Sequence, residues 1–216
     1  MLIKDKIKYK ILPGLNNYLP FNYLSRIING KKLIFLLFHR IEDQQNTWQF
    51  SSNKSLGIST KTLEATIKYF QQQNFQAITI ENAFEIINNK TLDGNYVIYT
   101  FDDGYKDNLY NALPVFEKYD IPFTVYIATD FIDNQLILWW YELEDILMLN
   151  ETISFLIGTR TIDFSLKTLR EKEIAFNKIS QIIRKKLLYN NKLIESLLYN
   201  YKTDLYELTN ALMMDW

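Results

Sequence analysis

The segment YVIYTFDDG, at Tyr96–Gly104, decides the expected fold. Tyr96–Phe101 is apolar at nearly every position, which is typical of a strand buried on both faces of a parallel sheet. Asp102, Asp103 and Gly104 follow it and close the strand. Ligand sites of parallel α/β folds lie beyond the carboxyl ends of the strands. The two adjacent carboxylates therefore stand where chemistry is expected.

Outward from this segment, apolar runs alternate with amphipathic ones. The runs predict four strands, at Leu33–Phe38, Gln76–Ile80, Tyr96–Phe101 and Ile121–Ala128. The amphipathic stretches predict three helices between them, from a cap at Ser59 or Thr60 to about Gln73, over Glu81–Asn89, and over about Lys106–Lys118. Strand-then-helix units in series predict an α/β fold with a mainly parallel sheet.

After Trp139 and Trp140 the pattern changes. We expect a helix through Met148, a hairpin over Ile153–Phe164 around Gly158, helices over about Lys167–Tyr201, and a helix or turn over Asp204–Trp216. This part is interpreted as a mainly helical insertion or lid with a hairpin, leading back to the first part. The expected domains are residues 1–138 and 139–216.

Composition limits the classes of function. The 216 residues are 48% hydrophobic and contain no Cys, so thiol chemistry, disulfides and cysteine-ligated metal sites are excluded. The net charge of −1, from 24 Lys and Arg against 25 Asp and Glu, argues against nucleic acid as a partner. There is one His. No run is long enough for a transmembrane segment and no signal peptide is recognised, so the cytoplasm is the default expectation.

Asp102 and Asp103 suggest a metal site. Like charges in a partly dehydrated cleft raise each other's pKa unless a cation compensates them. One carboxylate could bind a metal ion while its neighbour acts as a general base. The alternative is that Asp-Asp-Gly only forms a tight turn.

The segment YTFDDGY, at Tyr99–Tyr105, resembles the TFDDG motif of the polysaccharide deacetylases, the NodB-type or carbohydrate esterase family 4. Its surroundings are similar to the family as well. LLFHRI at Leu36–Ile41 resembles the first strand, LPVFEKYDIPFTVYIATDFI at Leu113–Ile132 resembles the helix and strand after the motif, and Trp139–Trp140 matches a pair in a large subgroup. The resemblance covers about residues 33–148.

The resemblance implies the first half of a distorted (β/α) barrel with a helical insertion. It also implies that a divalent metal, usually zinc, activates a water that attacks an N-acetyl carbonyl of a polysaccharide. Asp102 would then be the general base and Asp103 a metal ligand. Glycans bearing N-acetyl groups would be the substrate.

The family's later His-x-x-x-His segment, which completes the metal site, has no counterpart here, so the site is expected to be incomplete in this chain. LMMDW at Leu212–Trp216 resembles the segment that precedes those histidines. The sequence is therefore interpreted as a truncated deacetylase, whose activity is doubtful. In half a barrel the first and fourth strands would be open edges, so self-association is expected.

Further residues near the expected strand ends have two interpretations each. His39 is expected to bind substrate, with metal ligation as the less favoured alternative. Arg40 is a candidate for substrate binding, against a structural ion pair. Glu81 is interpreted as the start of a helix. Trp140 is a candidate for stacking on sugar, against packing in a core.

Two other functions stay open at this point. A magnesium-dependent phosphoryl-transfer or receiver-like domain would also hold an acidic pair at a strand end. A non-catalytic carbohydrate-binding or scaffold remnant would retain the cleft without the reaction.

Overall fold

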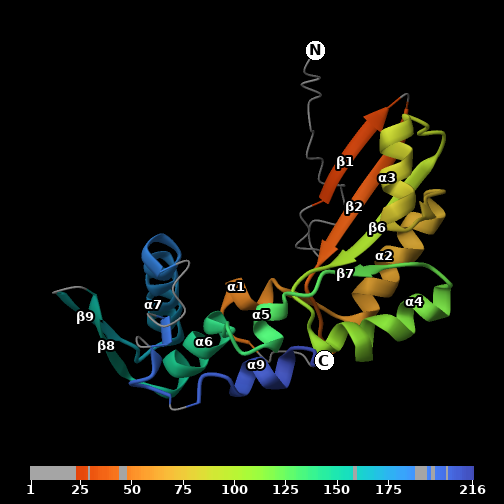
Figure 1. Ribbon diagram of the computed structural model, residues 1–216. Coiled ribbons are helices and arrows are strands. Elements are labelled where there is room, and N and C mark those ends of the chain that lie inside the picture. Colours follow the sequence, from red (N-terminus) through yellow and green to blue (C-terminus); the bar gives the residue numbers. More distant parts are fainter. Residues whose placement is uncertain are drawn as a thin grey trace. The chain divides into compact units, whose positions relative to one another are not determined.

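The computed structural model describes residues 23–28, 30–43, 48–157, 160–187, 194–195, 198–202 and 204–216 (Figure 1). Contacts divide the chain into two compact units. The sheet unit is drawn from Met1–Gln45 and Ser55–Ala128, and the helical unit from Asn46–Lys54 and Thr129–Trp216. The two units are described separately below.

The sheet unit is built on two long parallel strands, β2 (Lys31–Phe38) and β6 (Asn95–Phe101). They pair in register from Lys32↔Asn95 to Phe38↔Phe101. β1 (Tyr23–Ile28) adds to the other edge of β2 in antiparallel orientation, and these three strands lie side by side (Figure 1). The far edge of β6 carries two short parallel strands, β5 (Gln76–Ala77) at its start and β7 (Thr124–Val125) at its end.

Helices cover both faces of this sheet because the strand residues alternate. Ile34, Leu36 and Phe38 of β2 and their neighbours on β6 pack against α2 (Thr60–Gln72) and α4 (Leu113–Tyr119). Leu33 and Ile98 point to the opposite face, where Ala83 of α3 (Ile80–Asn89) covers them. A second, two-stranded sheet pairs β3 (Arg40–Ile41) with β4 (Gly57–Ile58) in parallel.

Local signals place the helix starts. Ser59 precedes α2 and its hydroxyl accepts from the Thr62 amide at 3.1 Å, while Thr79 does the same for Asn82 at the start of α3. A hydroxyl in this position satisfies an amide that has no partner inside the helix. Between β6 and α4 lies a π-helix, η1 (Asn108–Ala112).

The helical unit has its own apolar core, formed by α6, the hairpin and α7. Its elements are α1 (Ser51–Lys54), α5 (Thr129–Ile132), α6 (Trp139–Leu149), β8 (Thr152–Ile157), β9 (Arg160–Ser165), α7 (Leu169–Ile182), η2 (Ile183–Leu187) and α9 (Glu207–Leu212). β8 and β9 form an antiparallel hairpin. None of the helices in the described ranges is long and apolar enough to cross a bilayer.

Buried carboxylates organise this unit. Glu144 is 2% exposed, and its Oε1 accepts from the amides of Gln49 and Phe50 before α1, the latter at 3.0 Å. Its Oε2 accepts from Asn53 at 2.7 Å. The fully buried Glu142 pairs with Lys202 at 2.9 Å. These charges are paired because an unpaired buried charge would be strongly destabilising.

Most expected elements are confirmed, with the largest errors in the short strands. The strand expected at Gln76–Ile80 ends at Ala77, because Thr79 caps α3 from Ile80. The strand expected over Ile121–Ala128 pairs only at Thr124–Val125. The helix expected over about Lys106–Lys118 is confirmed, with the π-helix η1 inside it. The expected hairpin is confirmed, although Gly158 lies outside the described residues.

The expectation that the first predicted strand is an open edge is wrong. β1 pairs with all of Lys31–Leu36 and supplies the backbone partners on that side. The sequence YLSRII of β1 is apolar and β-branched enough for a strand, but no repeat of the strand-helix pattern identified it. The fold is thus mixed α/β, and within the described residues the strands form open sheets.

Aromatic packing joins β6 to α4, and this packing generates a prediction. Phe116 is 1% exposed, stacks on Phe123 at 4.4 Å between ring centroids, and contacts Tyr99 and Phe101 edge-on. Phe116→Ala should lower the free energy of unfolding by about 3–5 kcal/mol, because it leaves a cavity in the core. Urea unfolding monitored by circular dichroism measures this. Phe84→Ala, at a position on α3 that is 65% exposed, is the control and should change it by about 0.5 kcal/mol or less.

Candidate active site

The acidic pair lies in a turn that is held from two sides. The Asp102 amide donates to the Phe38 carbonyl at the end of β2, at 2.9 Å. On the other side, the Ala128 amide donates to the Asp103 carbonyl at 3.1 Å, and the Tyr126 amide to the Phe101 carbonyl at 2.8 Å. The turn is therefore attached to the end of β2 and to the residues after β7, and these are the strands that pair with β6 on its two sides.

Two consecutive residues of this turn have left-handed backbone conformations. The φ angle is 73° at Asp103 and 85° at Gly104. A Cβ atom on Gly104 would lie 3.1 Å from Cγ2 of Ile127. Glycine is therefore favoured here for two separate reasons, because φ is positive and because the neighbouring chain approaches closely. Asp is among the residues that tolerate the left-handed region best.

The environment disfavours a charge on Asp103. Burial raises the pKa of the Asp103 carboxyl above its ordinary value, and the charge of Asp102 raises it further, while His39 acts in the opposite direction. The structure thus brings His39, Asp102 and Asp103 close enough to interact electrostatically. His39 Nδ1 lies 3.1 Å from the Phe38 carbonyl oxygen, a contact that requires a proton on Nδ1.

Arg40 does not point into open solvent. Its side chain is 8% exposed, its Nε donates to Oδ2 of Asp107 at 2.9 Å, and it also pairs with Glu42. Its guanidinium carbon lies 5.2 Å from the centroid of the Tyr105 ring, as in a cation–π contact. These contacts favour the ion-pair alternative for Arg40 over substrate binding.

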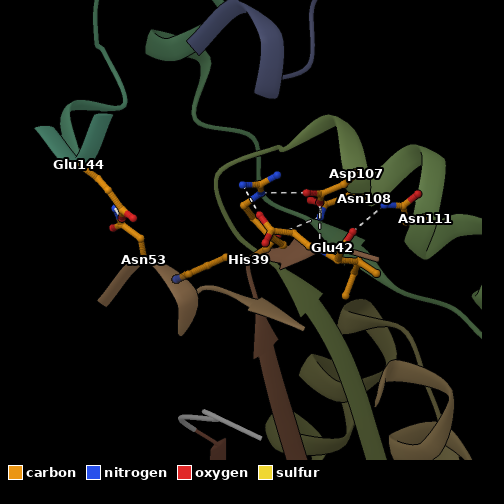
Figure 2. A network of polar contacts seen from close by, with 9 residues as sticks. His39, Glu42, Asn53, Asp107, Asn108, Asn111 and Glu144 are labelled. Atoms are coloured by element: carbon orange, nitrogen blue, oxygen red, sulfur yellow. Dashed lines mark hydrogen bonds and ion pairs between the residues drawn. The ribbon is translucent and has the colours of Figure 1, made fainter. Parts of the chain in front are cut away.

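A polar group on η1 and just before it faces the chain after β2. Figure 2 shows Asp107, Asn108 and Asn111 pointing toward the segment from His39 to Glu42. Asn108 donates to the His39 carbonyl at 2.9 Å, and Asn111 to the Ile41 carbonyl at 2.6 Å. Asp107 accepts from the Ile41 amide at 3.1 Å. Burial raises the pKa of Asp107, and Arg40 opposes that rise.

The metal site implied by the acidic pair is only partly present. Within the residues that the structure describes, no cluster of three or more His, Asp or Glu side chains is arranged to hold a metal ion. Zinc sites in proteins use about three protein ligands. The described side chains around Asp103 therefore do not fit a complete zinc site.

Glu81 and Trp140, which were also expected near the site, lie on other elements than the acidic turn. Glu81 lies in the first turn of α3, where its own amide and the Thr79 hydroxyl lower the pKa of its carboxyl, as a helix start predicts. Trp140 belongs to the helical unit, where it is partly buried and packs against the core and edge-on to Phe131. Sequence reasoning missed Asp107, Asn108 and Asn111. Their spacing, with three polar residues on one helical turn, was the available signal.

Residues 89–210, which are more than half of the chain, match the family model described as polysaccharide deacetylase. The chain belongs to the polysaccharide deacetylase family. The matched range contains the Asp102–Asp103 turn, η1 and most of the helical unit. Neither the phosphoryl-transfer alternative nor the non-catalytic alternative is supported by this match.

Similar proteins carry the same family description. The chain is 33% identical over 97 residues to YxkH, a proposed polysaccharide deacetylase of Bacillus subtilis (strain 168), covering 44% of this chain and 32% of YxkH. This deacetylase family chain therefore spans about a third of that relative.

Two solved structures show weak overall similarity. IcaB from Ammonifex degensii is 26% identical, with 48% of this chain and 40% of IcaB covered and a TM-score of 0.39. The deacetylase PplD from Streptococcus pyogenes is 19% identical, with 46% and 44% covered and a TM-score of 0.39. Membership of the deacetylase family rests on the match to the family model.

The turn of this deacetylase family chain generates a prediction about Gly104. Gly104→Ala should lower the free energy of unfolding by about 2–3 kcal/mol, because the variant combines a strained φ with a close contact to Ile127. Gly30→Ala is the matched control, since Gly30 has a φ of 77° but nothing within 4 Å of its added Cβ. The control should lose only about 1 kcal/mol. Equal losses in urea unfolding would contradict the role given to Ile127.

The raised pKa of Asp103 generates a prediction about pH. The folded-state pKa of Asp103 lies above its unfolded value of 3.8. The contribution of this carboxyl to folding stability is therefore fully present below pH 3.8 and is lost as the pH rises through the folded-state pKa. Asp103→Asn removes this loss, so in the presence of a chelator the variant should be more stable than the original chain at pH 7. The difference should disappear near pH 3, where both side chains are neutral. Parallel urea titrations at the two pH values measure it.

Proposed function

We propose that this chain contributes the acidic half of a site that hydrolyses N-acetyl groups on a glycan. The observation that supports the proposal is the Asp102–Asp103–Gly104 turn at the carboxyl end of β6, inside the range that matches the family. Polysaccharide deacetylases act on N-acetylated glycans, and the chemistry requires a base beside the attacked carbonyl. Asp102 is the proposed base.

The proposed reaction is the hydrolysis of an amide. A water oxygen forms a bond to the acetyl carbon while the Asp102 carboxylate takes a proton from that water. The carbon–nitrogen bond then breaks and the sugar nitrogen takes up a proton. Acetate and a free amine on the glycan are the products. Within this scheme the burial and left-handed backbone of the turn hold the carboxylates in one place.

Asp103 is proposed as one contact to a divalent metal, with zinc as the first candidate. The family is generally metal-dependent, and a cation beside Asp103 would offset its burial and the charge of Asp102. Because the described side chains do not complete a zinc site, further ligands would have to come from outside the described set. When bound, such an ion would polarise the attacked carbonyl or the water.

Two further side chains are proposed to contact the glycan. His39 interacts electrostatically with Asp103 at the end of β2, so an imidazole there would face a sugar bound at the turn. For the helical unit by itself, the proposal is that Trp140, which is partly buried, stacks on a sugar ring, as indole rings do. We also propose that residues 1–138 correspond to the first part of the family's (β/α) barrel and residues 139–216 to an insertion.

A zinc titration tests the metal part of the proposal. In calorimetry on metal-free protein, the zinc that binds at this partial site should bind at least about tenfold more weakly to Asp103→Asn, because a neutral amide is a poorer ligand than a carboxylate. Asp43→Asn is the matched control, because Asp43 is an exposed carboxylate whose contacts are the amide and hydroxyl of Thr60. Unchanged affinity in Asp103→Asn would remove Asp103 from the site.

The catalytic part is tested by acetate release from N-acetylglucosamine oligomers. Asp102→Asn should lower kcat by about 10²–10⁴-fold while zinc binding is retained, as expected for loss of a general base. If the unsubstituted chain binds zinc but releases no acetate, the proposed reaction does not occur in this chain alone.

A further inference from the structure

The segment that follows β2 has its backbone bound on both sides. On one side, the Arg40 and Glu42 amides donate to the carbonyls of Leu56 and Ile58, at 3.1 and 2.8 Å. On the other side, side chains of the η1 region bind three further backbone groups. These are the His39 carbonyl with Asn108, the Ile41 amide with Asp107 and the Ile41 carbonyl with Asn111. Asn108 is fully buried, so its contact is shielded from water.

Charge strengthens one of these contacts. Asp107, with a side chain 12% exposed, accepts from Arg40 Nε through one oxygen and from the Ile41 amide through the other. A single carboxylate therefore binds both the side chain of residue 40 and the backbone of residue 41. Charge-assisted hydrogen bonds of this kind are the stronger ones, and burial reduces screening by solvent.

These contacts lie on both chain segments that lead to the acidic turn. Phe38, whose carbonyl accepts from the Asp102 amide, directly precedes the bound segment. On the other chain segment, Asp107 follows Gly104 by three residues, and Tyr105 between them packs fully buried under the Arg40 guanidinium. η1 begins immediately after Asp107. π-Helical turns are frequent at functional sites, where they redirect side chains.

We propose that Asp107, through Arg40 and the Ile41 amide, is a positioning residue that holds the Asp102–Asp103 turn and His39 in the geometry the reaction needs. Asn108 and Asn111 support the same segment. Asp107 acts through these groups and has no contact with substrate in this scheme. That this geometry serves the reaction rests on the proposed function. That Asp107 holds the turn in place, which is the mechanical part of the inference, does not depend on it.

Site-resolved hydrogen exchange tests the mechanical part. In Asp107→Ala, the Ile41, Asp102 and Ala128 amides should exchange at least about tenfold faster, because each is bonded within the turn or the bound segment. The Ile78 amide, bonded to Val97 near the start of β6, should change less than about threefold. A purely stabilising role would accelerate all four amides together, and that result would overturn the proposal.

Two further variants keep the test decisive. Asp107→Asn retains an oxygen for the Ile41 amide but loses the charge opposite Arg40, so it should restore most of the protection at Ile41; no recovery there contradicts the assigned contact. It also serves if the Ala variant does not fold. Asp43→Ala removes another carboxylate that accepts from a backbone amide in the sheet unit, and it should leave the Asp102 and Ala128 amides unchanged. Acceleration of both by Asp43→Ala would overturn the special role of Asp107.

The zinc titration separates this inference from the proposed function. If the original chain binds zinc through Asp103, Asp107→Ala should bind it at least about tenfold more weakly, because this variant loses the contacts with both Arg40 and the Ile41 amide and the ligand is no longer held in place. Unchanged zinc affinity would overturn the positioning role while leaving the proposed function intact. If the original chain binds no zinc, the metal contact fails, and the exchange experiment still decides whether Asp107 holds the turn.

Discussion

The parallel pairing of β2 with β6 is the constraint on which the rest of the sheet unit depends. Its register ends at Phe38↔Phe101, and the next contact along the same ladder joins the Asp102 amide to the Phe38 carbonyl. Since both strands stop together, the residues that follow them emerge at one edge. His39 and the acidic pair are neighbours because of this register, although 62 or more positions separate them in the chain. A shift of one residue would turn the apolar side chains of either strand to the wrong face.

Two carboxyl groups, those of Asp103 and Asp107, are largely buried near this edge of the sheet, and burial destabilises their charged forms. Burial is the largest cause of the raised pKa of both Asp103 and Asp107, which means that the folded chain disfavours both charges. Arg40 acts against the rise at Asp107 through an ion pair, and His39 acts against the rise at Asp103 through its charge. Residues held at a cost to stability are a common property of functional sites.

The helical unit also buries carboxylates, and there they are bound by Lys202 and by backbone and side-chain amides. Burial raises the pKa of Glu142, and hydrogen bonds to Glu142 and Asp145 raise the pKa of Lys202 despite the burial of its own ammonium group. Both carboxylate oxygens of Glu144 accept hydrogen bonds, one from backbone amides before α1 and the other from the Asn53 side chain. These groups are therefore best explained by folding. Asp103, whose carboxyl has a pKa raised by burial and whose backbone is left-handed, is in the sheet unit.

The sequence by itself determined the long elements, since they follow from local rules. β6 is apolar along its whole length, α2 starts at a hydroxyl cap, and the β8–β9 hairpin alternates in polarity. The acidic turn and the family were also readable, because Asp-Asp-Gly after such a strand is a short contiguous motif. What only the tertiary structure decided were pairings between distant segments. β2 pairs with β6 along Lys32–Phe38, and Arg40 is ion-paired with Asp107. No local pattern encodes these contacts, because hydrogen bonds and ion pairs across 60 or more residues exist only once the strands bring both partners to the same edge.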